Sequence, residues 1–292
     1  MTDLFRTLKA WAERLGSRSL VVRAVRQNGT IRRYLLYVPQ HLKGAEMLPL
    51  VLMLHGGAGR PRDMARATRM HRIAEREGFL VAYPAGMPGG FGLTWNPGGQ
   101  IRRSTADDVG FIAAVIDDIR ASHAVDPARI YAAGMSIGGS MTYRLACALS
   151  ETFSAVGIVA GAMTCEDCRP DRPVSVIHIH GTDDRRVPVG GGRGPHTAPG
   201  NTWPPVWQAI DRWRTVDGCA READVVRLVS GLVGHRYKGT RGDVELWLVE
   251  GGRHVWPGAP PRGWFRLTRP PARFSASEKI WQFFAEHART KP

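Results

Sequence analysis

The segment that most limits how this chain can fold is residues 129–150, where a strand pattern passes through a tight turn into a helix pattern. A β-branched, apolar run at 129–133 leads into the sequence GMSIG at 134–138, and helical periodicity continues to residue 150. Glycines on both sides of Ser136 let the backbone turn where a Cβ would clash. Such a turn presents a serine hydroxyl at the end of a strand, which makes Ser136 a candidate nucleophile.

Similar strand and helix patterns alternate along the rest of the chain. Strand-like runs lie at 20–26, 31–38, 48–54, 79–83, 129–133, 155–160, 174–180 and 244–249. Helical patterns lie at 64–77, 107–123, 137–150, 206–216 and 277–287. This alternation predicts a mainly parallel sheet with helices on both faces, with the first two strands as an antiparallel hairpin at its edge.

The length and composition fit one domain. The 292 residues are 43% hydrophobic, and no change of composition marks a second unit, so we expect residues 1–292 to form a single α/β domain without a separate cap. Residues 1–18 are expected to form an amphipathic extension that packs on the domain, rather than an anchor for a lipid or polymer surface. Its apolar residues share one helical face: Leu4, Phe5, Leu8, Trp11 and Leu15.

The sequence carries no visible targeting signal. It has no signal-peptide pattern at its beginning and no run of 18 apolar residues, so we expect no transmembrane helix and, from the sequence as it stands, a cytoplasmic location. Lys and Arg number 40 against 26 Asp and Glu, a formal charge of +14. The arginines are scattered and accompany no nucleic-acid-binding motif, so a solvated basic surface is expected and nucleic acid is not.

Four cysteines leave their pairing open. Cys165 and Cys168 form a CxxC motif, and the sequence is compatible with a zinc site, a disulfide or free thiols at this motif. Cys219 lies far from the other cysteines in the sequence. Cys147 lies in an apolar helical stretch and is expected to pack in the core. No cofactor or catalytic metal is required by the motifs.

A candidate acid and a candidate base follow later strands. Asp183 and Asp184 come after the strand at 174–180, and only one of two neighbouring carboxylates can face a given histidine. His254 lies in a glycine-flanked loop directly after the strand at 244–249, in the order Ser, Asp, His. His178 and His180 belong to the earlier strand and are expected to be structural.

The strand at 48–54 ends in the sequence HGGAG, which suggests an oxyanion hole. In serine hydrolases, one donor is the amide that follows the nucleophile, here Ile137, and another comes from a loop after an earlier strand. Gly57 is the expected second donor, with Ala58 as the alternative.

Three long loops are expected to form the rim of a substrate cleft. They span 85–107, 189–205 and 256–274 and are rich in Gly, Pro, Asn and Arg. Each contains a tryptophan, and Trp95, Trp203 and Trp256 are candidate walls for an acyl or aryl group.

These elements together resemble the α/β-hydrolase esterases grouped with polyhydroxybutyrate depolymerases and feruloyl esterases. The shared sequence motifs are Arg33-Tyr34, Val38-Pro39, Trp95-Asn96, Asp107 to Phe111, Val125-Asp126-Pro127, the HGTxDxxVP stretch at 180–188, Trp213, Gly218-Cys219 and GGxHxWPG at 251–258. The resemblance implies that Asp184 is the acid. It also implies a secreted or cell-envelope serine esterase for a polymeric, oligomeric or phenolic ester. The alternatives are a serine peptidase or other hydrolase on the same fold, and a catalytically silent polymer-binding module.

Overall fold

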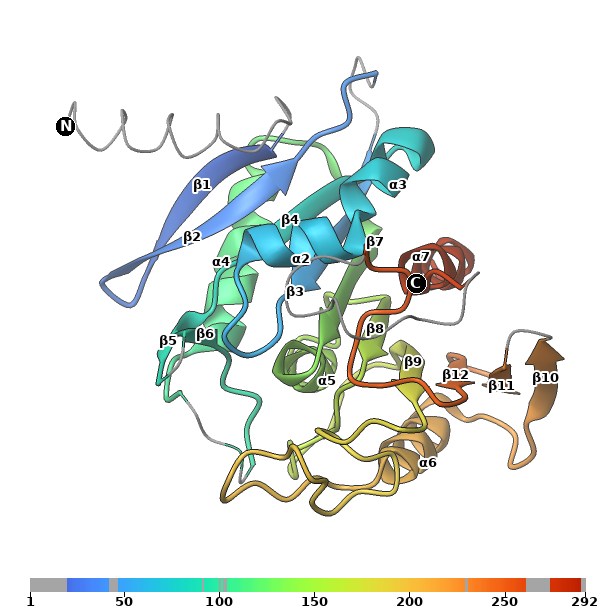
Figure 1. Ribbon diagram of the computed structural model, residues 1–292. Coiled ribbons are helices and arrows are strands. Elements are labelled where there is room, and N and C mark those ends of the chain that lie inside the picture. Colours follow the sequence, from blue (N-terminus) through green and yellow to red (C-terminus); the bar gives the residue numbers. More distant parts are fainter. Residues whose placement is uncertain are drawn as a thin grey trace.

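The central feature of the molecule is a single mixed β-sheet (Figure 1). The computed structural model describes residues 20–41, 47–90, 92–99, 101, 104–228, 231–260 and 274–289. In this part of the chain the strand order is β1-β2-β4-β3-β7-β8-β9-β12-β11-β10. The strands are β1 (Leu20–Gln27), β2 (Thr30–Tyr37), β3 (Leu48–Leu54), β4 (Leu80–Pro84), β7 (Val125–Met135), β8 (Ala155–Val159), β9 (Ser175–Gly181), β10 (Asp224–Leu228), β11 (Leu232–Tyr237) and β12 (Val244–Val249).

The middle of the sheet is parallel and both edges are antiparallel. Strands β4, β3, β7, β8, β9 and β12 pair in parallel. Strands β1 and β2 form the predicted antiparallel hairpin. Strands β10 and β11 extend the other edge in antiparallel pairing and were not predicted. Four of the five residues of β10 are exposed, so this strand lacks the apolar alternation by which a half-buried strand is recognised.

Six helices of the described chain cover the two faces of the sheet (Figure 1). They are α2 (Pro61–Thr68), α3 (Met70–Glu77), α4 (Asp108–Arg120), α5 (Ile137–Ala148), α6 (Val206–Asp217) and α7 (Ala276–Glu286). Side chains of α4, α5 and α6 pack with one set of strand residues, and those of α2, α3 and α7 with the alternate set. The predicted mainly parallel sheet with helices on both faces is therefore confirmed.

Four predicted segments differ from the structure or lie wholly or partly outside the described residues. The helix predicted at 64–77 is divided into α2 and α3 because Arg69 adopts a left-handed conformation with φ of 50°. The loop predicted at 85–107 contains a short hairpin of β5 (Met87–Gly89) and β6 (Gly92–Thr94). The amphipathic extension at 1–18 and most of the loop at 256–274 lie outside the described residues. Where the structure describes the chain, no helix has the length and apolar character to span a bilayer.

Candidate active site

Ser136 occupies a strained turn between β7 and α5. Its φ is 56°, in the left-handed region that residues other than glycine rarely adopt. A Cβ at Gly134 would lie 2.3 Å from the carbonyl oxygen of Gly138, and a Cβ at Gly138 would lie 2.4 Å from that of His55. Glycine is therefore required on both sides of Ser136, which explains the GMSIG sequence sterically.

The three residues named from the sequence as nucleophile, acid and base lie in hydrogen-bond contact. His254 Nε2 is 3.0 Å from Ser136 Oγ, and His254 Nδ1 is 2.7 Å from Asp184 Oδ2. A carboxylate can only accept, so Nδ1 carries the proton and Nε2 presents its lone pair to the serine hydroxyl. The three residues follow β7, β9 and β12, which run in parallel, so they meet at the carboxyl edge of the sheet.

Asp184 is buried and held as a carboxylate. Its Oδ1 accepts hydrogen bonds from the amides of Arg186 and Val187, at 2.8 and 2.9 Å. Burial acts to raise the pKa of Asp184, but the hydrogen bonds from His180 and His254 outweigh it and lower that pKa well below its ordinary value. The neighbouring carboxylate points elsewhere: Asp183 lies 3.2 Å from the guanidinium of Arg185.

The amides that could stabilise an oxyanion come from α5 and from the loop after β3. Ile137 is the first residue of α5, so its amide has no acceptor one turn back in the helix. The loop lies against the serine turn, because a Cβ at Gly56 would be 3.5 Å from Ser136 Cβ and a Cβ at Gly57 would be 3.6 Å from Ile137 Cγ2. Among the described residues, the Gly57 amide has no acceptor.

The alternative donor, Ala58, is excluded. Its amide faces the β5–β6 hairpin, where it donates to the carbonyl oxygen of Leu93 at 2.9 Å. An amide that is already paired within the protein is not available to a substrate, so the prediction for Ala58 is wrong and Gly57 is the candidate that remains.

His55 fixes the loop that carries Gly57. Its buried ring accepts from the amide of Gly86 at Nε2, 3.0 Å away, and donates from Nδ1 to the carbonyl oxygen of Gly56, 2.8 Å away. Burial lowers the pKa of His55 to about 4, so the ring is neutral and keeps this donor and acceptor pattern. The sequence motif had indicated the loop but not this supporting role of its histidine.

All three tryptophans named as substrate contacts are buried, and two of them have almost no accessible surface. Trp95 is 0% exposed and donates from Nε1 to the carbonyl oxygen of His55, and Trp256 is 1% exposed and donates to Ser277 Oγ. A ring without accessible surface cannot touch a substrate, so the prediction is wrong for both, and each anchors its loop instead.

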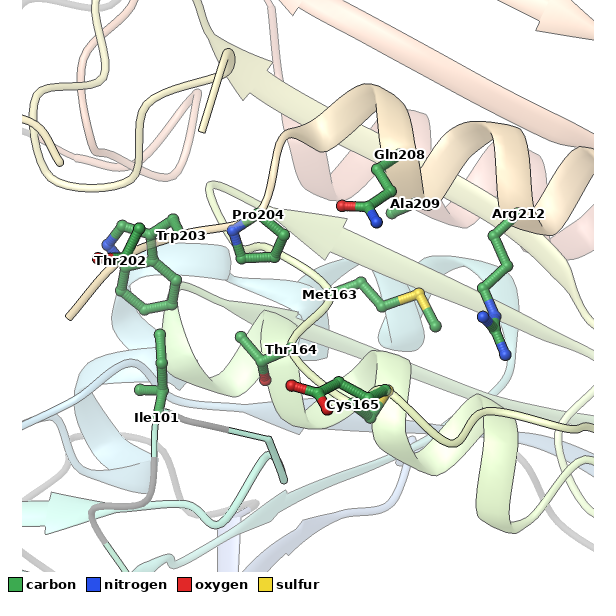
Figure 2. A pocket seen from close by; sticks show the side chains of 11 residues that line it. Ile101, Met163, Thr164, Cys165, Thr202, Trp203, Pro204, Gln208, Ala209 and Arg212 are labelled. Carbon is green, nitrogen blue, oxygen red and sulfur yellow. The ribbon is translucent and has the colours of Figure 1, made fainter. Parts of the chain in front are cut away.

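Trp203 does line a cavity of about 450 Å³ (Figure 2). Figure 2 shows Trp203 and Ile101 at one end of this cavity and Arg212 at the other, with Met163 between them. The lining segment at 163–166 comes just after Gly161, where a Cβ would be 2.8 Å from the carbonyl oxygen of Ser136. The chain therefore passes from contact with the nucleophile turn directly into the cavity wall.

Three of the four cysteines lie together beside the cavity. Cys147 and Cys168 form a disulfide between α5 and the segment after β8, so the prediction that Cys147 only packs in the core is wrong. Cys165 is a free thiol with its Sγ 3.8 Å from that of Cys147, and Cys219 is also free. Three sulfurs at this spacing resemble a metal-binding set, but two of them are joined to each other and lack the free thiolates that zinc requires.

Comparison with known sequences relates most of the chain to esterases. The family described as Esterase PHB depolymerase matches residues 32–189. Feruloyl esterase B of Piromyces equi is 28% identical over 242 residues, which cover 80% of this chain and 44% of that protein. A putative esterase, NocK, of Nocardia uniformis subsp. tsuyamanensis is 31% identical over 227 residues, which cover 72% of this chain and 66% of that protein. The chain thus spans between about half and two thirds of the length of these curated relatives.

The structural comparison identifies the fold. An acetyl xylan esterase from Aspergillus awamori superposes with a TM-score of 0.64 at 16% identity, over 90% of this chain and 98% of that one. Similarity at this identity is informative about the fold alone. The chain has the α/β-hydrolase fold, as the sequence predicted.

Proposed function

Because the chain belongs to the esterase PHB depolymerase family, we propose that it is a serine esterase that hydrolyses carboxylic esters through an acyl-enzyme. The observation that carries the proposal is the pair of contacts made by His254, at 3.0 Å to Ser136 Oγ and 2.7 Å to Asp184 Oδ2. An accessible lone pair on Nε2 next to a serine hydroxyl is what general-base activation of that hydroxyl needs.

In the first half of the reaction, Ser136 becomes acylated. Its Oγ attacks the ester carbonyl carbon while His254 Nε2 takes the hydroxyl proton, and the imidazolium that forms is stabilised by the Asp184 carboxylate. The carbonyl oxygen gains negative charge and is received by the amides of Ile137 and Gly57, each contributing on the order of 3 kcal/mol of barrier reduction. Collapse of the intermediate breaks the ester C–O bond, and His254 returns the proton to the leaving alcohol.

In the second half, water releases the acid. His254 Nε2 takes a proton from a water molecule, which attacks the acyl carbon, and the same two amides hold the second oxyanion. The bond to Ser136 Oγ then breaks and the serine regains its proton from His254. Every step uses side chains and amides of this chain, with the proton passing back and forth on one ring nitrogen.

The cavity lined by Trp203 supports a bulky acyl or aryl group as the substrate, because its wall at 163–166 follows Gly161, which contacts the nucleophile turn. Its volume of about 450 Å³ exceeds what an acetyl group fills, and Trp203, Ile101 and Met163 give it an apolar wall. The relatives carry names that refer to feruloyl and acetylxylan esters, and the family name refers to a polyester. We therefore propose esters with aromatic or oligomeric acyl groups, including those borne by polymers, as the substrate class.

The two alternatives from the sequence are less well supported. A catalytically silent binding module has no need of a base hydrogen-bonded to a serine on one side and to a buried carboxylate on the other. A serine peptidase would share the machinery, so assays on peptide substrates run beside the esters distinguish the scissile bond. Labelling by a fluorophosphonate probe separates an active serine from a silent cleft.

The experiment that tests the proposal is a hydrolysis panel with the wild type and Ser136→Ala side by side. The panel contains short and long p-nitrophenyl esters, methyl ferulate and a polyhydroxybutyrate suspension. We expect turnover by the wild type, loss of nearly all of it in Ser136→Ala without loss of fold, and preference for the bulkier acyl groups. Ester hydrolysis that persists in a verified Ser136→Ala protein, or wild-type turnover of peptides alone, would contradict the proposal.

A further inference from the structure

A line of buried polar side chains leads from α5 to the acid of the site. Tyr143 Oη is 2.7 Å from His178 Nδ1, and His178 Nε2 is 2.9 Å from His180 Nδ1. His180 Nε2 is in turn 2.8 Å from the carbonyl oxygen of Val187. Tyr143, His178 and His180 are each at most 1% exposed, so water does not compete for these contacts.

The end of this line at Val187 sets the direction of its hydrogen bonds. A carbonyl oxygen only accepts, so His180 Nε2 carries a proton and donates it. In a neutral ring, Nδ1 of His180 is then an acceptor, and the facing Nε2 of His178 must be the donor. The opposite assignment would place two lone pairs or two protons against each other at 2.9 Å.

The other end of the line agrees with this direction. Burial, together with the neighbouring His180, lowers the pKa of His178 well below its ordinary value, so the ring is neutral. Because its Nε2 donates to His180, its Nδ1 is an acceptor. Burial raises the pKa of Tyr143, with Cys165 as the nearby titratable group, so the phenol keeps its proton and donates it to that nitrogen. All three donors therefore point from α5 toward the turn at 184–187.

That turn is the one that holds the catalytic carboxylate. His180 Nε2 faces Asp184 Oδ2 at 3.4 Å as well as the carbonyl oxygen of Val187, and the same Oδ2 receives His254 Nδ1. The amide of Val187 donates to the other oxygen, Oδ1, at 2.9 Å. One imidazole N–H thus fixes the backbone of the turn and lies against the oxygen that orients the base.

We propose that His180 is a positioning residue of the active site, which holds the Asp184 carboxylate toward His254 through a hydrogen bond whose direction is set by His178 and Tyr143. This inference rests on the proposed function, because it assigns a role within the same triad. His180 touches neither the substrate nor Ser136, so its removal affects the chemical step and leaves substrate binding unchanged. A fixed tautomer matters here because a ring with its proton on Nδ1 would turn a lone pair toward the carboxylate.

Two variants of His180 separate the N–H that faces the turn from the rest of the ring. His180→Gln keeps an N–H close to the position of Nε2, whereas His180→Asn keeps a polar group near Nδ1 and does not reach Val187. Groups that orient a metal-binding histidine through a hydrogen bond typically contribute about 10- to 100-fold to metal affinity or activity, and we expect a contribution of the same order for a group that orients the triad carboxylate. We expect kcat for a p-nitrophenyl ester to fall by about that factor in His180→Asn with KM unchanged, and His180→Gln to retain most of it.

The pH profile provides a readout that a purely structural role would not move. Without the His180 N–H, the Asp184 charge is less compensated and holds a proton on His254 more strongly. The acid limb of kcat/KM is therefore expected to shift to higher pH in His180→Asn and to stay in place in His180→Gln. Tyr143→Phe, which removes only the remote donor, should fall between the wild type and His180→Asn.

Ring-nitrogen NMR of the wild type tests the inference independently of turnover. With ¹⁵N-labelled histidine, the ring protons of His178 and His180 should each be found on Nε2. A proton on Nδ1 of His180, or kcat and acid limb at wild-type values in a folded His180→Asn protein, would overturn the inference. A wild-type protein that hydrolyses no ester but shows these tautomers would contradict the proposed function and leave the positioning geometry standing.

Discussion

Asp183 and Asp184 are neighbours in the chain whose carboxylates have different surroundings. Asp184 is buried against His254, whereas the Asp183 carboxylate is partly exposed beside Arg185. Asp184→Asn would preserve the shape of the site but replace the carboxylate that accepts from His254 Nδ1 with a neutral amide. We therefore expect kcat to fall by about 10⁴-fold. Asp183→Asn is the matched control and should stay close to wild type. Steady-state kinetics on one ester compare them, and equal losses in both variants would contradict the assignment of the acid.

Asp217 is a buried carboxyl whose titration should be visible in stability. Burial, assisted by Asp243, raises its pKa from an ordinary 3.8 to about 8. Its Oδ1 accepts from the amide of Val174, while Oδ2 has no partner among the described residues. Between these two pKa values the folded state keeps a proton that the unfolded chain releases, so this residue makes the free energy of unfolding fall as pH rises.

Asp217→Asn keeps the acceptor for Val174 and removes the titration. We therefore expect its free energy of unfolding, relative to the wild type, to increase between pH 5 and pH 8. Urea denaturation of both proteins at the two pH values measures this difference. A difference that is constant with pH, or that shrinks as pH rises, would show that Asp217 is not protonated in the folded protein.

At the residue scale, the sequence was informative where a residue's role depends on local turns. Ser136 and His254 follow strand ends in glycine-flanked turns, and the resemblance distinguished Asp184 from Asp183. The failures all depended on contacts made far along the chain. The amide of Ala58 donates to the carbonyl oxygen of Leu93, and the indole of Trp95 donates to the carbonyl oxygen of His55. Neither contact leaves a periodic signal in the sequence.

At the scale of elements, the turn between β7 and α5 depends on the absence of a Cβ at residue 138. In Gly138→Ala the added methyl would lie 2.4 Å from the carbonyl oxygen of His55 and 2.6 Å from that of Leu54, so β3 and α5 must separate. We expect a loss of about 1 to 3 kcal/mol in the free energy of unfolding, together with a large loss of activity.

Gly190→Ala is the matched control for this change. Its Cβ would have no atom within 4 Å, and the position is exposed. Thermal and urea denaturation should therefore find it close to wild type, with activity retained. If Gly138→Ala were equally harmless, the close approach of β3 to α5 could not be what requires glycine there.

The elements that were predicted well are those whose apolar pattern reflects burial in this sheet. Strands β3 and β12 have the predicted bounds because nearly all their residues are buried. The break between α2 and α3 could not be predicted, because it depends on one left-handed residue, Arg69, within a continuous helical pattern. The second antiparallel edge was missed because exposed strands carry little pattern.

At the scale of the whole molecule, the disulfide restricts the unfolded chain. Cys147 and Cys168 are 21 residues apart. In the chain-entropy model, closing a loop of that size increases the free energy of unfolding by about 3 kcal/mol. Cys147→Ala removes any such closure, so we expect a loss of about that size in the free energy of unfolding. In Cys168→Ala, Cys165 lies close enough to Cys147 to take over the bond, so the loss should be smaller.

The two cysteine variants are compared after folding in a glutathione redox buffer. Urea denaturation gives the two losses, and peptide mapping under non-reducing conditions should find a Cys147–Cys165 bond in Cys168→Ala. Equal losses, with Cys147 and Cys165 both unpaired in Cys168→Ala, would exclude this exchange of partners.

The arrangement of the parallel strands also determines when activity appears during folding. Ser136 and His254 touch across 118 positions of sequence, and Asp184 and His254 across 70. Contacts of such separation form late, because the loop-closure entropy must be overcome before they contribute. Helices such as α4 can form early from local contacts alone. Turnover therefore returns only when the topology of the sheet is complete. During refolding, we expect it to recover later than the helical circular-dichroism signal.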